Sequence, residues 1–229
     1  MSNTTVSVTT EASDSKSPKT KGNTYHHGDL KASLITAART ILQRDGADAL
    51  SLRSIAAEVG VSHMAPYSHF KNKKELIQAI TADGFRSLAT AMEQDSQGLQ
   101  KPEELILAYG TSYLEFAVNN PQLYRIMLGQ VDSQGRRNRK ENPSQALEPK
   151  LSIEQDGFSE GPYALLKNAF ASVYQDETMI KAQAIGAWSI VHGMAALIIE
   201  GHIDIPEGTS LKQFLAKAAL RASPNIELI

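Results

Sequence analysis

Several side chains with distinct polar chemistry lie in one short part of the sequence, residues 51–73. Here Arg53 carries a guanidinium, His63 and His69 carry imidazoles, and Tyr67 carries a phenol. A guanidinium can bridge two acceptors on a guanine edge, whereas hydroxyl, imidazole and ammonium groups near helix N-termini suit phosphate oxygens. These residue types therefore predict recognition of a polyanion.

Other kinds of chemistry lack the residues they need. The sequence has no cysteine, which excludes disulfides, thiolate zinc sites, iron–sulfur clusters and cysteine nucleophiles. It has no Gly-rich phosphate loop, no G-x-S-x-G elbow and no H-E-x-x-H pair. His26 and His27 beside Asp29 suggest a metal site, but no further ligand completes it. We therefore predict no enzyme activity, no metal and no cofactor.

Two short helices joined by a tight turn are expected to position the polar residues. The segment Ser51–Phe70 reads SLRSIAAEVGVSHMAPYSHF. Ser51 is an N-cap for the first helix, and Gly60 can take the backbone angles that a tight turn needs. Ser62 is an N-cap for a second helix that runs to about Phe70. Such a helix-turn-helix pattern places its second helix in the major groove of DNA.

The flanking segments also have helical spacing. Asp29 is expected to cap a helix that ends at Gly46, and Asn72 to cap another, with Glu75 completing a capping box. The prolines at 102 and 121 are expected to open two more helices. Three further helices are predicted near residues 160–175, 177–203 and 209–222, and no segment alternates for long enough to predict a strand. The predicted fold class is therefore all-α.

Charge and composition divide the chain unevenly. Residues 1–74 carry ten Lys or Arg and six Asp or Glu, whereas residues 75–229 carry thirteen and nineteen. A polyanion is therefore expected at the N-terminal end. The first 24 residues contain 11 Ser or Thr and predict a disordered tail. The polar stretch 131–158 predicts a mobile loop.

No segment predicts a secretory signal or a membrane span. The opening residues lack an apolar core. The most apolar stretch, Ile185–Ile199, has only 15 residues and contains His192 and two glycines. A soluble cytoplasmic protein is therefore expected, with no membrane partner.

The continuous segment Ile41–Ile80 resembles the DNA-binding domain of the tetracycline-repressor (TetR) family. The family's Tyr-x-His-Phe ending of the recognition helix is matched by Tyr67, His69 and Phe70. Its Asn-Lys-x-x-Leu start of the next helix is matched by Asn72, Lys73 and Leu76. The stretch from Trp188 to Gly193 resembles the Trp-x-x-x-His-Gly signature of one TetR C-terminal subgroup. The implied organisation is a tail over 1–24, a DNA-binding domain over 25–87 and a helical regulatory and dimerisation domain over 88–229.

Carried over residue by residue, the resemblance implies two kinds of DNA contact. Positions that face base edges in the family are matched by Arg53, His63, Met64 and Ala65. Positions that hold phosphates are matched by Ser51, Tyr67, His69 and Lys73. Phe70 is interpreted as core instead. Pro66 and the small Ser68 depart from the family pattern, and the proline predicts a recognition helix that is short or locally 3₁₀.

The resemblance also implies a homodimeric transcriptional regulator, a repressor rather than an activator, on a palindromic operator in double-stranded DNA. Residues 177–203 are too apolar for one covered face, and the next helix carries a stripe of Leu211, Phe214, Leu215 and Ala218. These two helices are expected to pair across a two-fold axis.

A small apolar or aromatic effector is expected inside the C-terminal domain. The candidate lining residues are Tyr109, Tyr113, Phe116, Tyr124, Met127, Tyr163, Phe170, Trp188 and His192. Ordinary core is the alternative interpretation of these side chains, and His192 in particular fits a satisfied core histidine. Two alternatives for the whole chain also stay open. One is a DNA-binding chromosome-organising protein, and the other is an all-helical carrier or enzyme without a DNA role.

Overall fold

The computed structural model describes residues 27–129 and 161–221, and every regular element in these ranges is a helix. The all-α prediction is therefore confirmed. The described elements are α1 (His27–Asp45), the 3₁₀ turn η1 (Ala47–Ala49), α2 (Leu52–Val59), the 3₁₀ turn η2 (Ala65–Ser68), α3 (Lys73–Asp95), α4 (Pro102–Asn119), α5 (Pro121–Met127), α6 (Pro162–Ala171), α7 (Glu177–Ile199) and α8 (Leu211–Arg221). The predicted tail, the predicted loop and the side chains of the proposed metal cluster lie outside the described residues.

The first two helices begin and end largely where local chemistry dictates. Gly46 follows α1 with φ of 81°, and Gly60 ends α2 in the left-handed region with φ of 77°. Ser51 caps α2 by accepting the N–H of Ser54, whose hydroxyl in turn accepts the N–H of Ser51. The predicted cap at Asp29 is wrong, because α1 already begins two residues earlier, at His27.

The expected recognition helix is reduced to a single 3₁₀ turn. An α-helix from Ser62 to Phe70 was predicted, but only η2 forms, and Ser62 accepts the N–H of Met64 from outside it. Pro66 has no N–H to give, and the N–H groups of His69 and Phe70 both bond to its carbonyl. The 3₁₀ alternative that the proline predicted is therefore confirmed.

Helix α3 follows residues 62–70, which we call the recognition turn, and is continuous into the C-terminal half of the molecule. Asn72 caps it by accepting the N–H of Glu75 at 3.0 Å. The expected capping box is not complete, because the Glu75 carboxylate accepts the N–H of Lys71 instead of that of Asn72. The helix then runs without interruption across residue 87, the domain boundary expected from the sequence.

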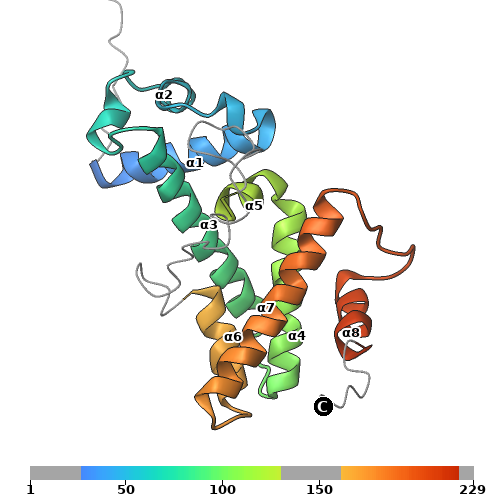
Figure 1. Cartoon of the computed structure of the whole chain (residues 1–229). Helices are drawn as coiled ribbons and strands as arrows, with labels where there is room; N and C mark the ends of the chain where they lie inside the picture. The colour runs from blue at the N-terminus through green and yellow to red at the C-terminus, as the bar shows by residue number, and fades with distance from the viewer. Residues whose placement is uncertain (1–26, 130–160, 222–229) are drawn as a thin grey trace, which may run out of the picture.

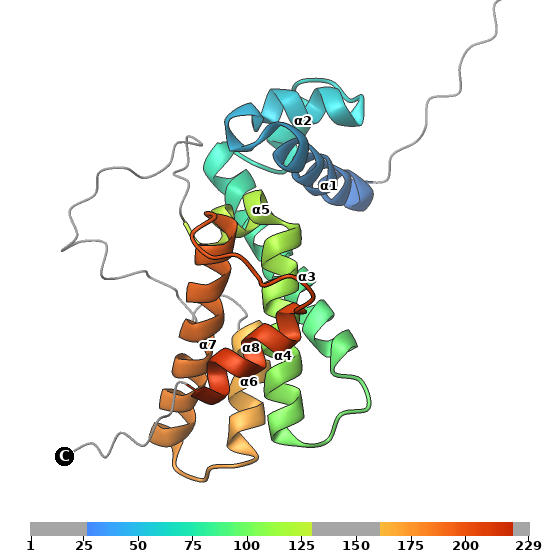
Figure 2. The ribbon, with the colours of Figure 1, turned by 90° about the vertical axis from the view of Figure 1, so that its right-hand side faces the viewer.

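The C-terminal half is a helical bundle around α4. Figures 1 and 2 show α4 beside α7, and Figure 2 shows α8 lying across the face of α4. Helix α4 packs against α3, α6, α7 and α8, whereas α5 packs against α3 and α1. Pro102 and Pro121 open α4 and α5, as predicted. Helix α5 therefore lies between the N-terminal helices and the bundle.

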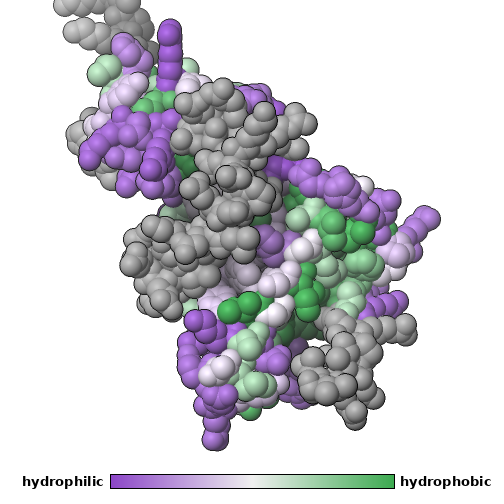
Figure 3. Space-filling view, viewed as in Figure 1, coloured by the Kyte–Doolittle hydropathy of each residue, from purple (hydrophilic) through white to green (hydrophobic). Residues whose placement is uncertain are grey.

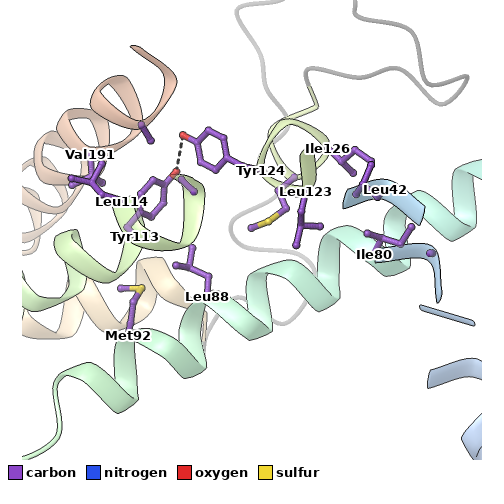
Figure 4. Packing of buried hydrophobic residues seen from close by; sticks show 14 of the residues in the cluster. Leu42, Ile80, Leu88, Met92, Tyr113, Leu114, Leu123, Tyr124, Ile126 and Val191 are labelled. Carbon is purple, nitrogen blue, oxygen red and sulfur yellow. Dashed lines mark hydrogen bonds between the residues drawn. The ribbon is translucent and has the colours of Figure 1, made fainter. Parts of the chain in front are cut away.

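A single hydrophobic core runs through both halves. It extends from Leu42 on α1 through Ile80 on α3 to Leu123 on α5, and continues to Leu114 on α4 and Val191 on α7. Figure 4 shows these side chains along one line of packing. Because the two halves share this core, the helices near the recognition turn and those of the bundle are one packed body.

Helix α7 is less covered than its composition predicts. It was expected to be buried on several sides, but Met179, Ile185, Ile190 and Leu197 are exposed. Figure 3 shows apolar and near-neutral residues along this helix. By length and composition alone, this helix of 23 residues is apolar enough to cross a membrane, a test that core helices of soluble proteins also pass. Its buried side packs against α4 and α6.

Candidate nucleic-acid interface and effector cavity

Arg53 lies on the first turn of α2 and is exposed. Its neighbours Leu52 and Ile55 are buried and hold the helix against α1 and the core. A bidentate pair between Arg44 and Glu58, with distances of 3.2 and 3.1 Å, also ties α1 to α2. No hydrogen bond or ion pair to another described residue engages the Arg53 guanidinium. Its five N–H donors therefore face solvent on a rigid support.

The recognition turn presents its side chains around one anchored residue. Pro66 is fully buried and Phe70 is 2% exposed, which confirms Phe70 as core. On the outer side, Met64 is 59% and Tyr67 is 51% exposed, and His63 is exposed as well. The Ser68 hydroxyl donates to the carbonyl of Ala65 at 2.7 Å and so closes the turn. With Pro66 buried in the core, the side chains of Met64 and Tyr67 lie on the outer side of the turn.

The residues expected at phosphates have roles inside the protein as well. The Ser51 hydroxyl is the cap of α2, and the Lys73 ammonium lies 3.4 Å from the carbonyl oxygen of Ala47. His69 is half-buried, and its Nε2 is enclosed without a hydrogen-bond partner among the described residues. A phosphate contact from His69 would therefore need its other ring nitrogen. The exposed ammonium groups on this side belong to Lys71 and Lys74.

A cavity of about 470 Å³ opens between α4, α7 and α8. Its described lining is Met92, Glu103, Glu104, Ile106, Leu107, Tyr109, Gly110, Tyr113, Leu166, Ala187, Trp188, Ile190, Val191, Leu215 and Ala216. The two carboxylates are exposed at its rim, and no Lys or Arg is among these residues. The cavity is therefore lined mainly by apolar side chains, and the acidic pair in this described lining includes Glu104, which forms an ion pair of 3.2 Å with Lys101.

Three of the expected effector-binding residues line this cavity: Tyr109, Tyr113 and Trp188. The other expected residues lie elsewhere in the bundle: Phe116, Tyr124, Met127, Tyr163, Phe170 and His192. Sequence reasoning missed the small and aliphatic part of the lining, including Leu107, Gly110 and Leu215. Aliphatic residues at helical spacing carry no signal that distinguishes a cavity wall from core.

Tyr113, Tyr124 and His192 form a closed ring of hydrogen bonds behind the cavity. The Tyr113 hydroxyl donates to that of Tyr124 at 3.3 Å, and the Tyr124 hydroxyl donates to the His192 carbonyl at 3.3 Å (Figure 4 shows the tyrosine pair). Nδ1 of His192 lies 3.2 Å from the Tyr113 hydroxyl. Because that hydroxyl gives its one proton to Tyr124, Nδ1–H is the donor in this third bond.

Burial controls the protonation of this ring. It raises the pKa of Tyr113, with the neighbouring Tyr124 adding to the effect, and it raises the pKa of Tyr124 as well. Burial also lowers the pKa of His192. All three groups are therefore neutral near pH 7, and their hydrogen bonds join α4, α5 and α7. Arg125 on α5 adds an ion pair of 2.9 Å to Glu200 after α7.

Helix α2, the turn at Gly60 and the outward-facing recognition turn define a helix-turn-helix DNA-binding protein. Residues 34–80 match the family model described as bacterial regulatory proteins of the tetR family. Residues 106–218 match the model of the tetracyclin repressor-like C-terminal domain. The chain belongs to the TetR family and is a transcriptional regulator.

Solved structures with the same fold include bacterial proteins of several kinds. A protein of unknown function from Rhodococcus sp. RHA1 is 26% identical, with a TM-score of 0.63 over 86% of this chain and 95% of that one. A TetR-like transcriptional regulator from the same organism is 17% identical, with a TM-score of 0.54 over 84% and 94%. The regulator FadR of Bacillus subtilis, in complex with stearoyl-CoA, is 12% identical, with a TM-score of 0.57 over 82% and 94%.

Proposed function

We propose that this chain is a homodimeric repressor that binds a palindromic operator and leaves it when a small apolar effector fills the cavity. The observation that carries the proposal is the recognition turn. Pro66 is buried in the core, while Met64 and Tyr67 are exposed on the turn and Arg53 is exposed on α2, the helix that packs against it. Such a protein acts in the cytoplasm, where bacterial DNA is read.

The DNA contacts divide into base readout and phosphate attraction. Arg53 is the side chain suited to a guanine edge, because a guanidinium can donate to N7 and O6 together. Lys73 is suited to a phosphate because its side chain carries a positively charged ammonium group, which lies 3.4 Å from the carbonyl oxygen of Ala47. A two-fold dimer would place two recognition turns about one DNA turn, ~34 Å, apart.

The test compares Arg53→Ala with Lys73→Ala on operator and on random DNA at several salt concentrations. Arg53→Ala should lower discrimination by ~1–3 kcal/mol if the contact is bidentate. Lys73→Ala should weaken binding to all sequences and flatten the salt dependence. Lys101→Ala serves as a control for Lys73, because Lys101 is an exposed lysine before α4, outside the N-terminal helices. Unchanged operator affinity and salt slope in both variants would remove this surface from consideration.

The effector proposal rests on the size and lining of the cavity. A volume of about 470 Å³ lies within the range of small-molecule sites, and its walls are aliphatic and aromatic. The FadR structure contains stearoyl-CoA. In this chain an acyl chain or an aromatic group would suit the walls. The phosphates of a CoA moiety would meet Glu103 and Glu104 and no cation from the described lining.

Release of DNA would follow from unequal affinity for two dimer geometries. An effector that prefers the geometry with wrongly spaced recognition turns lowers operator affinity by that preference. A screen of hydrophobic compounds by thermal shift and DNA release would find such a molecule. Trp188→Ala should abolish its effect, whereas Phe116→Ala, an aromatic truncation away from the cavity, should keep it. Failure of every compound to release DNA would leave the DNA assignment standing and remove the effector.

A further inference from the structure

The recognition turn presents an apolar side chain on a fixed backbone. The N–H of Met64 donates to the Ser62 hydroxyl at 3.3 Å, and its carbonyl accepts the N–H of Tyr67 at 3.1 Å. The side chain itself is 59% exposed. A residue held at both backbone groups keeps its Cβ direction, so the thioether extends into solvent from a defined point.

The 3₁₀ geometry groups Met64 with a second exposed residue. In this geometry residues three apart lie on the same side, which places Tyr67 in line with Met64. The buried Pro66 lies between them in sequence and points the other way, into the core. The outer side of the turn is therefore a ridge formed by the apolar side chain of Met64 and the aromatic ring of Tyr67, next to the polar His63.

Only one kind of group in the major groove suits such a ridge. Guanine, cytosine and adenine present hydrogen-bonding edges there, whereas thymine adds a C5-methyl group. A methionine has no N–H or O–H to donate, so covering the N7 and O6 acceptors of guanine would leave them unpaired at a cost, and its sulfur is only a weak acceptor for the N4 amino group of cytosine. Against thymine, the same side chain buries a methyl group and gains free energy.

We infer that Met64 reads the C5-methyl group of one thymine in each half-site of the operator. The inference rests on the proposed function, because it needs the recognition turn to enter the major groove. Arg53 and Met64 then select opposite kinds of base, one through two hydrogen-bond acceptors and the other through a methyl group. Each half-site contains both a guanine and a thymine.

The test removes the methyl group alone. An operator is first selected from random double-stranded DNA with the full chain. Deoxyuridine then replaces thymine at one position at a time, and each replacement is made at the equivalent position of both half-sites. For the wild type, one symmetric pair of replacements should weaken binding roughly fourfold per half-site, the effect of one buried methyl group. For Met64→Ala, the same pair should change affinity less than twofold.

Two further proteins make the comparison specific. Met64→Leu keeps an apolar side chain of similar size and should keep most of the deoxyuridine effect. Val173→Ala truncates another exposed apolar residue, away from the recognition turn, and should behave as wild type. Melting temperatures that match the wild type show that the variants fold, as expected for substitutions at exposed positions.

Three outcomes separate the inference from the proposed function. Equal losses in wild type and Met64→Ala at every thymine overturn the inference, because the methyl group then acts through DNA stacking. A selected operator with no deoxyuridine effect, but with a loss of discrimination in Arg53→Ala, overturns the inference alone. Selection of no DNA by the wild type overturns the proposed function and the inference together.

Discussion

Tyr113, Tyr124 and His192 form one hydrogen-bonded ring in which all three side chains are neutral near pH 7. The three residues lie on α4, α5 and α7, and burial favours the neutral form of each. The ring uses the Nδ1 proton of His192, the two phenol protons and a main-chain carbonyl. Because each bond in it has one donor and one acceptor, the loss of any member leaves a polar group without a partner.

This ring makes stability depend on pH through His192. Its pKa is lowered by burial, so the unfolded chain binds a proton at a higher pH than the folded one. The stabilisation is present above about pH 6.5, the ordinary value for histidine, and is lost as the pH falls through the folded-state pKa. Unfolding free energy measured by urea between pH 7.5 and 5.5 should therefore fall less in His192→Gln than in wild type. Glutamine can still donate to Tyr113.

The exposed His202 is the matched control for this measurement. His202→Gln should keep the pH dependence of the wild type. If His192→Gln keeps it as well, the ring does not couple protonation to folding.

The residue types predicted the structural features that depend on neighbours in the sequence. They did not predict the features that depend on contacts between distant segments. The caps at Ser51 and Asn72 and the turn at Gly60 form as predicted, because each depends on neighbours within a few positions. The enclosure of His69 Nε2 was not predictable in the same way. It depends on how the turn packs against other helices, and no sequence spacing reports that.

At the scale of elements, α8 is attached to the body mainly through α4. Leu215 is buried, and its Cδ2 would lie 2.8 Å from a Cβ added at Gly110. Because Gly110 has no side chain, there is space on α4 at this position, and the side chain of Leu215 occupies it. This fit corrects the predicted stripe on α8, since Leu215 faces its own chain and is not available to a partner.

A double substitution tests that fit. Leu215→Ala should destabilise the protein by ~2–5 kcal/mol, and Gly110→Ala should cost ~1–3 kcal/mol through overpacking. With both changes, the new methyl group occupies part of the space that leucine leaves, so the combined cost should be less than the sum. Thermal or urea unfolding of the four proteins measures this. Strict additivity would mean that the two side chains do not share the space.

Element prediction was accurate in type and weaker at the ends. Periodicity and prolines placed α4, α5 and α7 correctly, because the apolar face and the missing N–H are local signals. The cavity was not predictable in outline. Its walls come from α3, α4, α6, α7 and α8, and only the packing of these helices shows which apolar residues leave a space between them.

At the scale of the whole molecule, the uncovered side of α7 matters most. Leu197 and Met179 are exposed on it, and a Cβ at Gly186 or Gly193 would meet no atom within 4 Å. Small residues let another helix approach closely, and the exposed apolar residues would gain from being covered. Ala218 on α8 is exposed as well. The second copy proposed above is the partner that such a surface suits.

Charges on this surface should separate the two copies. Leu197→Glu with Ala218→Glu is expected to give monomers with poor operator affinity, because two carboxylates would be buried at a two-fold interface. Val173→Glu, a charge at an exposed position outside α7 and α8, should remain dimeric. Sedimentation at micromolar concentration is the measurement. A wild-type protein that sediments as a monomer there would contradict the dimer.

The uninterrupted helix α3 connects the recognition turn directly with the wall of the cavity. It is roughly 35 Å long at 1.5 Å per residue, with Asn72 beside the recognition turn and Met92 in the cavity wall. Near its middle, Gly84 lets Met127 of α5 approach so closely that an added Cβ would lie 2.6 Å from the sulfur. This close contact is the point about which α3 would tilt. A tilt of about 5° there moves each end by roughly 1.5 Å. In the proposed dimer, such a tilt in both copies would change the half-site spacing by about 3 Å, close to the rise of one base pair. A recognition turn that keeps its own shape would still lose its register on the operator.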